Sequence, residues 1–178
     1  MPDALINVNG ESVQALEILF LTTMITLLPS LVVMMTSFTR YVISFSFLRT
    51  AMGTQQTPPN LVLVGMALFL TLFTMSPVLN EIKTEAYDPY VAEEIDQEEF
   101  FRRAEVPLKD FMARNIQSNT LEMFCDLAKV DMPDPVNTAT VVEQVPLRVV
   151  VPAFITCELQ KAFTIGLLLY IPFMLIDI

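Results

Sequence analysis

The sequence contains no histidine and only two cysteines, Cys125 and Cys157. The absence of histidine removes the commonest general base and the commonest metal-binding side chain. Two cysteines 32 positions apart form no metal-binding or redox motif. We therefore expect both as unpaired thiols that pack as small hydrophobic side chains.

Motifs of nucleotide-binding and hydrolytic enzymes are also missing: no glycine-rich phosphate loop, no HExxH pair and no GxSxG turn occurs. An acidic run at 93–99 lacks the ligand order and the glycine of an EF-hand, so it is interpreted as a solvated face. No basic face is present to bind a phosphate backbone. These absences predict a protein that is not an enzyme, needs no cofactor or metal, and binds no nucleic acid.

What the sequence has in excess is hydrophobic residues, which make up 53% of its 178 positions. Charged residues account for 17%, against about 25% in average soluble domains. The net charge of −10 is concentrated between Glu81 and Glu143, where 15 acidic and 6 basic residues lie. The pattern predicts an all-α membrane-type protein that carries one acidic, hydrophilic insert.

Four segments follow from this pattern. Residues 1–15 are polar and acidic, unlike a cleavable signal peptide. Residues 16–80 form a kinked hydrophobic helical hairpin, 81–146 form the acidic helical insert, and 147–178 form a further hydrophobic helix.

The hairpin begins with an uncharged run from 18 to 39, which is long enough to cross about 30 Å of hydrocarbon. Pro29 is expected to kink or break this helix. Its threonines and serines form either a helix-packing stripe or bonds to their own backbone carbonyls. Residues 61–79 form the second spanning helix, with Pro77 marking its exit.

The connection at 38–60 carries Arg40 and Arg49 and no acidic residue. By the positive-inside rule these arginines mark the cytoplasmic side, which places the insert outside the cytoplasm. The first half of this connection continues as helix, and Gly53 with the following prolines predicts a tight turn.

The insert is interpreted as short amphipathic helices. Glu98 and Glu99 are spaced to pair with arginines four residues later. Pro107 suits a first helical position, and Asn119 with Glu122 resembles a capping box. Two aromatic residues, Phe111 and Phe124, face either an internal core or another subunit.

The last block holds two charges, Glu158 and Lys161, on one helical face. Such a pair is costly in lipid, so we expect it to contact protein. The charge-free part, 162–176, spans only about 22 Å as a helix. Either the chain is a fragment, or this block is buried in an assembly and not in lipid.

Three stretches carry a family resemblance: TSFTRYVISFSFLRTAMGTQQTPPN at 36–60, ALFLTLFTMSPV at 67–78 and VPLRVVVPAFITCELQKAFTIGLLLYIPFMLID at 145–177. In order and spacing they resemble the FliP family of flagellar export gates, which is similar to the R component of injectisomes. The resemblance covers nearly the whole chain from about residue 16. The long insert favours the flagellar branch.

The resemblance implies a non-enzymatic, pore-forming subunit of the flagellar type III export gate in the bacterial cytoplasmic (inner) membrane, at the flagellar basal body. The implied partners are copies of the chain in a ring of five, FliQ-like and FliR-like gate subunits, other export-apparatus membrane proteins, unfolded substrates and membrane lipid. The insert would lie in the periplasm. Glu158 would sit at a subunit or helix contact, and Phe111 and Phe124 would support ring assembly.

Family members continue with a further hydrophobic hairpin, whose methionine cluster seals the pore, and that hairpin does not occur in this sequence. The last helix, 147–178, is therefore expected to be truncated relative to the family. The alternative function is a small-solute or ion transporter that uses Glu158 and Lys161 as pathway charges. Transporters usually show internal repeats, and none is visible here.

Overall fold

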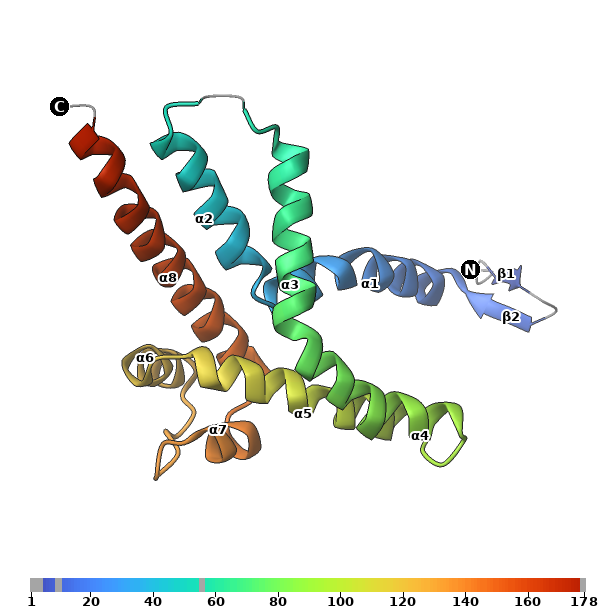
Figure 1. Ribbon diagram of the computed structural model, residues 1–178. Coiled ribbons are helices and arrows are strands. Elements are labelled where there is room, and N and C mark those ends of the chain that lie inside the picture. The colour runs from blue at the N-terminus through green and yellow to red at the C-terminus, as the bar shows by residue number, and fades with distance from the viewer. Residues whose placement is uncertain (1–4, 9–10, 55–56, 177–178) are drawn as a thin grey trace. The chain divides into compact units, whose positions relative to one another are not determined.

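The computed structural model describes residues 5–8, 11–54 and 57–176. Residues 55–56 of the predicted connection, and the chain ends 1–4 and 177–178, lie outside the described residues. The predicted fold class, an all-α membrane-type protein, is confirmed (Figure 1). The structure differs from this prediction in one feature, a pair of four-residue antiparallel strands, β1 Leu5–Val8 and β2 Glu11–Gln14.

The chain divides into two compact units, at Val33 and Met34, which are described separately. In the first unit the two strands lead into helix α1, Ala15–Met34. The hydroxyls of Thr22, Thr23 and Thr26 each donate to the backbone carbonyl four residues earlier, at 2.7 Å. Of the two sequence interpretations for these threonines, backbone bonding is the one the structure shows.

Helix α1 is not broken at Pro29, because its helical assignment continues to Met34. A proline removes one backbone hydrogen bond, and apolar helices tolerate that loss where other groups satisfy the freed carbonyl. Helix α1 ends at Met34, and a turn separates it from the next helix, which begins at Phe38. In this turn Thr36 Oγ1 accepts a hydrogen bond from the Phe38 amide at 3.4 Å.

The second unit contains the remaining helices (Figure 1). Helices α2 and α8 lie side by side and run in the same direction, while α5, α6 and α7 gather at the end where α8 begins. The bounds are α2 Phe38–Ala51, α3 Asn60–Ile82, the π-helical turn η1 Lys83–Tyr87, α4 Asp88–Val91, α5 Gln97–Asn115, α6 Ser118–Ala128, α7 Thr138–Gln144 and α8 Leu147–Ile176.

Helix α3 buries one narrow face and exposes the other. Its buried residues recur every three or four positions, which is the helical repeat. On the opposite face Leu61, Phe69 and Phe73 are 84%, 74% and 77% exposed. In water such a surface would be unstable, so this helix is built for an apolar environment.

Pro77 does not mark the end of α3, contrary to the sequence interpretation. The helix passes it and continues through η1 and α4 to Val91. Two stretches are long and apolar enough to cross a membrane, Asn60–Val91 and Leu147–Leu175. Neither stretch is mostly buried within the protein, since 22% and 28% of their apolar windows are buried.

The insert has a core that α8 completes. Side chains from α5, α6 and α7 pack with the first two turns of α8, and the largest fully buried residue is Phe154. A segment of this size has little core of its own, so the apolar start of α8 supplies the missing half. The buried cluster is Met112, Leu121, Cys125, Val141, Val145, Val149, Val150 and Phe154.

Two local predictions within the insert are wrong. Pro107 lies inside α5 and not at its start, where Asp96 caps the helix by accepting from the Glu99 amide at 2.8 Å. The capping box predicted at Asn119 is absent, and Asn119 accepts from the next amide instead. A capping box does occur at Asn137, which exchanges hydrogen bonds with Thr140 at 3.0 and 3.1 Å.

Candidate functional site

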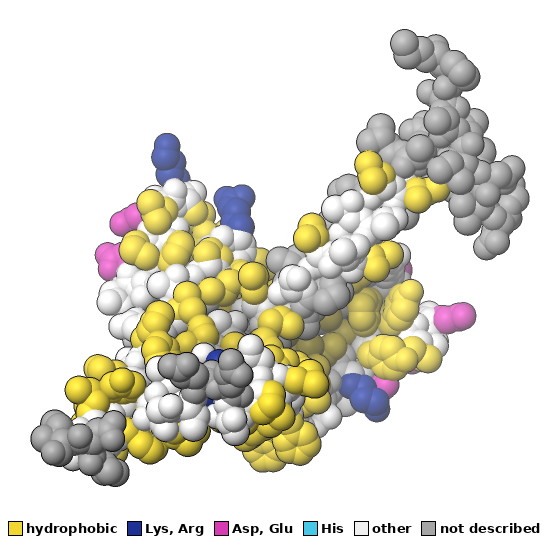
Figure 2. Space-filling model, turned by 90° about the horizontal axis from the view of Figure 1, so that it is seen from above, with side chains coloured by type: hydrophobic (Ala, Val, Ile, Leu, Met, Phe, Trp, Pro, Cys, Tyr) yellow, Lys and Arg dark blue, Asp and Glu magenta, His cyan; other side chains and the backbone are white. Residues whose placement is uncertain are grey.

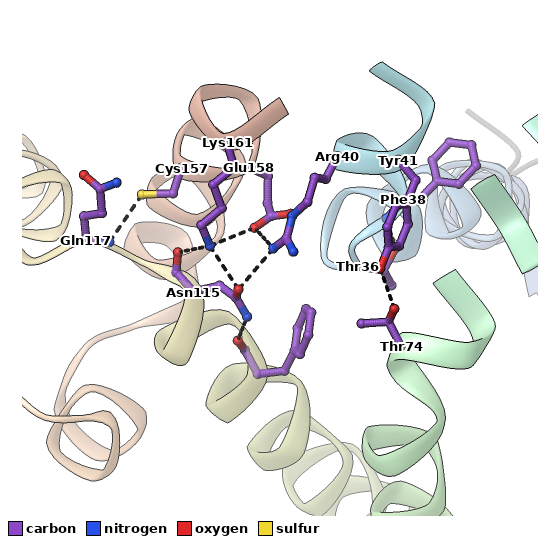
Figure 3. A network of polar contacts seen from close by, with 11 residues as sticks. Thr36, Phe38, Arg40, Tyr41, Thr74, Asn115, Gln117, Cys157, Glu158 and Lys161 are labelled. Atoms are coloured by element: carbon purple, nitrogen blue, oxygen red, sulfur yellow. Dashed lines mark hydrogen bonds and ion pairs between the residues drawn. The ribbon is translucent and has the colours of Figure 1, made fainter. Parts of the chain in front are cut away.

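Glu158 is the centre of a polar network that joins α2, α5 and α8 (Figure 3). Its side chain is 1% exposed, although it belongs to a largely apolar helix. Arg40 of α2 clasps it with two bonds: Nε donates to Oε2 at 2.6 Å and Nη2 donates to Oε1. This bidentate, planar pairing is the strongest form of carboxylate recognition by a side chain.

Lys161 adds a second cation to the same carboxylate. Its ammonium group lies one helical turn after Glu158 and donates to Oε1 at 3.3 Å. Two positive charges and one negative charge therefore meet at this point, and the site carries a net charge of +1. Removing a charge from water costs several kcal/mol, so a buried carboxylate needs compensation of this kind.

Asn115 connects the two cations to the insert. Its side-chain oxygen accepts from Arg40 Nη2 at 3.1 Å and from Lys161 Nζ at 3.0 Å. Its backbone carbonyl accepts from Lys161 at 2.9 Å. Its amide nitrogen donates to the Phe111 carbonyl at 2.9 Å, which holds the side chain in place.

The position of Asn115 explains why it binds cations. It is the last residue of α5, where backbone carbonyls lack partners within the helix and the helix dipole is negative. The Lys161 ammonium satisfies one of those carbonyls and one of the charges at once. The network therefore caps the end of α5, pairs the buried carboxylate with two cations, and connects α2, α5 and α8.

A close-packed seam between α2 and α8 extends the contact beyond the network. Phe47 and Phe163 meet edge to face, with ring centroids 5.5 Å apart. A Cβ atom on Gly166 would lie only 2.6 Å from the Phe47 ring, so a side chain there would overlap it. Gly166 is required by close approach and not by backbone conformation.

Smaller contacts surround the network (Figure 3). The Tyr41 and Thr74 hydroxyls share a hydrogen bond of 2.6 Å between α2 and α3. The backbone amide of Gln117 donates to the Cys157 sulfur at 3.4 Å. Both cysteines are free and buried, and burial raises the pKa of the Cys125 thiol above its usual range.

The structure brings together two of the predicted site residues, Glu158 and Lys161, and adds Arg40 to them. Phe111 and Phe124 lie elsewhere, half-buried against the insert core. Phe111 meets Phe154 of α8 edge to face at 5.8 Å. The sequence left two kinds of contact open for these aromatic residues, an internal core or another subunit. Within the chain, both rings pack against the internal core.

The two arginines predicted to mark one side of a membrane lie at opposite ends of α2. Arg40 contacts Asn115 of the insert, whereas Arg49 bonds to Asn60 at the start of α3. The first half of the connection 38–60 is helical, as the sequence predicted, because 38–51 form helix α2. Only Arg49 is placed away from the insert, and Arg40 is a structural partner of Glu158.

Sequence reasoning missed Asn115 and the pairing role of Arg40. Arg40 lies 118 positions from Glu158, and no local spacing relates the two. One signal was available: within 18–80 and 147–176, Glu158 is the only acidic residue, and Arg40 and Arg49 in the first of these ranges have no acidic residue there to pair with. Among the described residues, no group of three histidine, cysteine or acidic side chains could hold a metal ion.

Comparison with known proteins gives a consistent result. A protein-family model described as the FliP family matches residues 21–178. The flagellar biosynthetic protein FliP of Aquifex aeolicus (strain VF5) is 46% identical over 170 residues, covering 96% of this chain and 70% of that protein. The protein of the same name from Bacillus subtilis (strain 168) is 42% identical, covering 90% and 70%. That of Pectobacterium carotovorum is 44% identical, covering 92% and 61%.

Proposed function

The chain belongs to the FliP family, and from this premise we propose that it is a structural, pore-forming subunit of the flagellar type III export gate. Membership places it in the flagellar export apparatus, as a membrane-associated protein. The finer proposal is that it passes unfolded substrates across the cytoplasmic membrane as part of a ring. It matches about 70% or less of the length of the three relatives named above, so the activity of the whole protein is part of the proposal.

The observation that carries the proposal is the saturated network around Glu158. Both carboxylate oxygens are bonded by cations, and Lys161 makes three contacts, all within the chain. Such a site holds helices in a fixed relation and leaves no vacant ligand position. That arrangement supports a structural role for Glu158 and Lys161 at a helix contact.

The same saturation argues against the alternative, a small-solute or ion transporter. A transport site must bind and release its ligand, which requires groups that exchange partners. Here Glu158 is bonded on both oxygens and buried from solvent. No discontinuous helix lines it in the described part of α8, which runs unbroken from Leu147 to Ile176.

The apolar exterior supports assembly. Helices α3 and α8 expose large hydrophobic side chains along most of their length, including Phe73, Leu167 and Leu175. Lipid or other subunits must cover such a surface. We propose copies of the chain, FliQ-like and FliR-like subunits and membrane lipid as the covering partners, with the acidic insert on the periplasmic side.

The deciding experiment is native mass spectrometry of the tagged protein, extracted with mild detergent from a cell that makes the sister subunits. We expect a particle with several copies of the chain and the sister subunits together. A monomer or dimer that conducts ions in planar bilayers would establish the transporter instead.

The role of Glu158 is tested in the same preparation. Glu158→Ala should lower the yield of the multi-subunit particle, because two cations lose their shared carboxylate. The control is Glu98→Ala, which removes the same charge from an exposed position on α5. Equal yields for both variants would show that the network has no role in assembly.

A further inference from the structure

A groove lies between the ends of α2 and α3 that face away from the insert. Its cavity volume is about 530 Å³, within the range of about 300–1,000 Å³ that small-molecule sites occupy. Its walls are apolar, formed mainly by Val42, Ile43, Phe47, Val64 and Phe163. Ten residues line it, and a single one of them, Arg49, carries a charge.

Arg49 has no carboxylate partner among the described residues. Its Nη1 group donates to the Asn60 side-chain oxygen and to the Pro58 carbonyl, at 3.5 Å, and both acceptors are neutral. Arg40 on the same helix is neutralised by Glu158. The sequence contains no acidic residue from 18 to 80, so α2 and the part of α3 up to residue 80 offer Arg49 no counter-charge.

Two threonine hydroxyls near Arg49 are already bonded within the chain. The Thr50 hydroxyl donates to the Ser46 carbonyl at 3.0 Å, and the Thr54 hydroxyl donates to the Arg49 carbonyl at 3.1 Å. The positive charge of Arg49, which has only neutral acceptors, lies beside an apolar wall. A matching ligand therefore has one anionic end and one long apolar end.

The surroundings are those of a membrane protein. Figure 2 looks onto this end of α2, α3 and α8 and shows hydrophobic side chains over much of the surface, with few charged ones among them. An arginine at the end of an apolar helix reaches the lipid headgroup region and pairs with phosphate there. Basic pockets between membrane helices are recurrent sites for anionic headgroups.

We propose that this groove binds an anionic phospholipid, with its phosphate on Arg49 and an acyl chain along Val42, Phe47 and Val64. An extended peptide fits less well, because its backbone would need hydrogen-bond partners that these walls lack. An acyl chain needs none. The proposal holds whether or not the protein forms an export gate, since it depends only on α2, α3, α8 and the membrane.

The test uses the full chain in detergent, with phosphatidylglycerol and phosphatidylcholine of identical acyl chains as probes. Native mass spectrometry measures the lipid retained, and thermal unfolding measures the shift that each lipid produces. One arginine near a headgroup is worth about a fivefold preference for the anionic lipid. We expect phosphatidylglycerol to be retained about fivefold better and to raise the unfolding temperature, with phosphatidylcholine giving little of either.

Variants locate the site. Arg49→Gln should abolish the preference, whereas Arg148→Gln, which removes an exposed positive charge at the start of α8, should keep it. Val64→Trp should fill the groove and reduce retention while the charge stays. Inorganic phosphate should not compete at millimolar concentration, because it lacks the acyl chain.

Four results would overturn the proposal. If the unaltered protein retains the two lipids equally, the groove has no preference for an anionic headgroup, and no variant is needed to reject the proposal. A preference that survives Arg49→Gln places the lipid elsewhere. Competition by inorganic phosphate assigns Arg49 to a simple anion. If the dimer binds neither lipid while the monomer binds them, a second copy of the chain occupies the groove.

Discussion

The insert and the apolar helices distribute their charges in opposite ways. On the insert most charged side chains are exposed, with Lys109 as a buried exception. Glu99 pairs with Arg102 and Arg103 near the surface, while Met112 and Leu121 are buried. In the apolar helices many large hydrophobic side chains are exposed, whereas Glu158 is buried at 1% exposure. One chain therefore carries a surface for water and a surface for an apolar environment.

The difference shows how each region handles the cost of a charge. A charge in water is already solvated, so the pairs of Glu99 add little and need no support. A charge away from water must be compensated by neighbours, and Glu158 has two cations and an amide around it. The network lies where α5 of the insert meets α2 and α8, so it also connects the two regions.

The largest effect is expected from Glu158→Ala. It leaves Arg40 and Lys161 as unpaired cations, which should lower the free energy of unfolding by about 3–5 kcal/mol. The measurement is thermal or denaturant unfolding in detergent, followed by circular dichroism. Glu99→Ala is the matched control on the insert and should leave the unfolding midpoint nearly unchanged. Similar shifts for the two variants would remove the contrast between the regions.

Phe111→Ala tests the insert core. The ring is half-buried and loses its edge contact with Phe154, so we expect a loss of about 2 kcal/mol, below the 3–5 kcal/mol of a fully buried phenylalanine. Phe124→Ala should act in the same direction, since that ring packs on the same cluster. Leu127→Ala, at a position 73% exposed on α6, is the control. If the phenylalanine variants unfold with the unaltered protein in detergent, the rings serve a contact outside the chain.

Gly166→Ala tests the seam between α2 and α8. The added methyl group overlaps the Phe47 ring, which should destabilise the protein by about 1–2 kcal/mol. Gly65→Ala on α3 meets no atom within 4 Å and should stabilise the helix by up to about 1 kcal/mol. The unfolding midpoints of the two variants are measured under the same conditions. Shifts of the same sign would contradict the close approach of Gly166 to the Phe47 ring.

The smallest effect is a pH dependence at the start of α5. Hydrogen bonds from Arg103, which has the larger effect, and from Arg102 hold the pKa of Glu99 below its usual value of 4.5. A lowered pKa in the folded state means stability that is complete above pH 4.5 and is lost as the pH falls through the folded-state pKa. Glu99→Gln should flatten this part of the unfolding profile. An unchanged profile would show that the arginines do not hold the carboxylate.

Sequence periodicity predicted the existence and type of the long helices, but not all of their limits. The apolar run at 61–79 predicted a helix that in fact extends from Asn60 to Ile82 and onward through η1. Pro77 and Pro107 misled because a proline removes only one backbone bond, and neighbouring packing can outweigh that loss. The capping box was placed at Asn119 instead of Asn137, since several sites match so short a motif.

The candidate site could be predicted only in part. The spacing of Glu158 and Lys161 places them on one helix face, and that spacing is local. Their partners Arg40 and Asn115 lie 118 and 46 positions away along the chain, from Glu158 and Lys161 respectively. No periodicity in a single sequence relates residues so far apart, because only the packing of α2 and α5 on α8 brings them together.

The sequence by itself determined that the chain is helical, apolar and divided by an acidic insert, because composition and periodicity act over a few neighbouring residues. Its motifs also indicated the FliP family, to which the chain belongs. Tertiary structure alone decided that Arg40 neutralises Glu158 while Arg49 has no carboxylate partner among the described residues. Both arginines look alike in the sequence, and their difference arises from which helix end each one occupies.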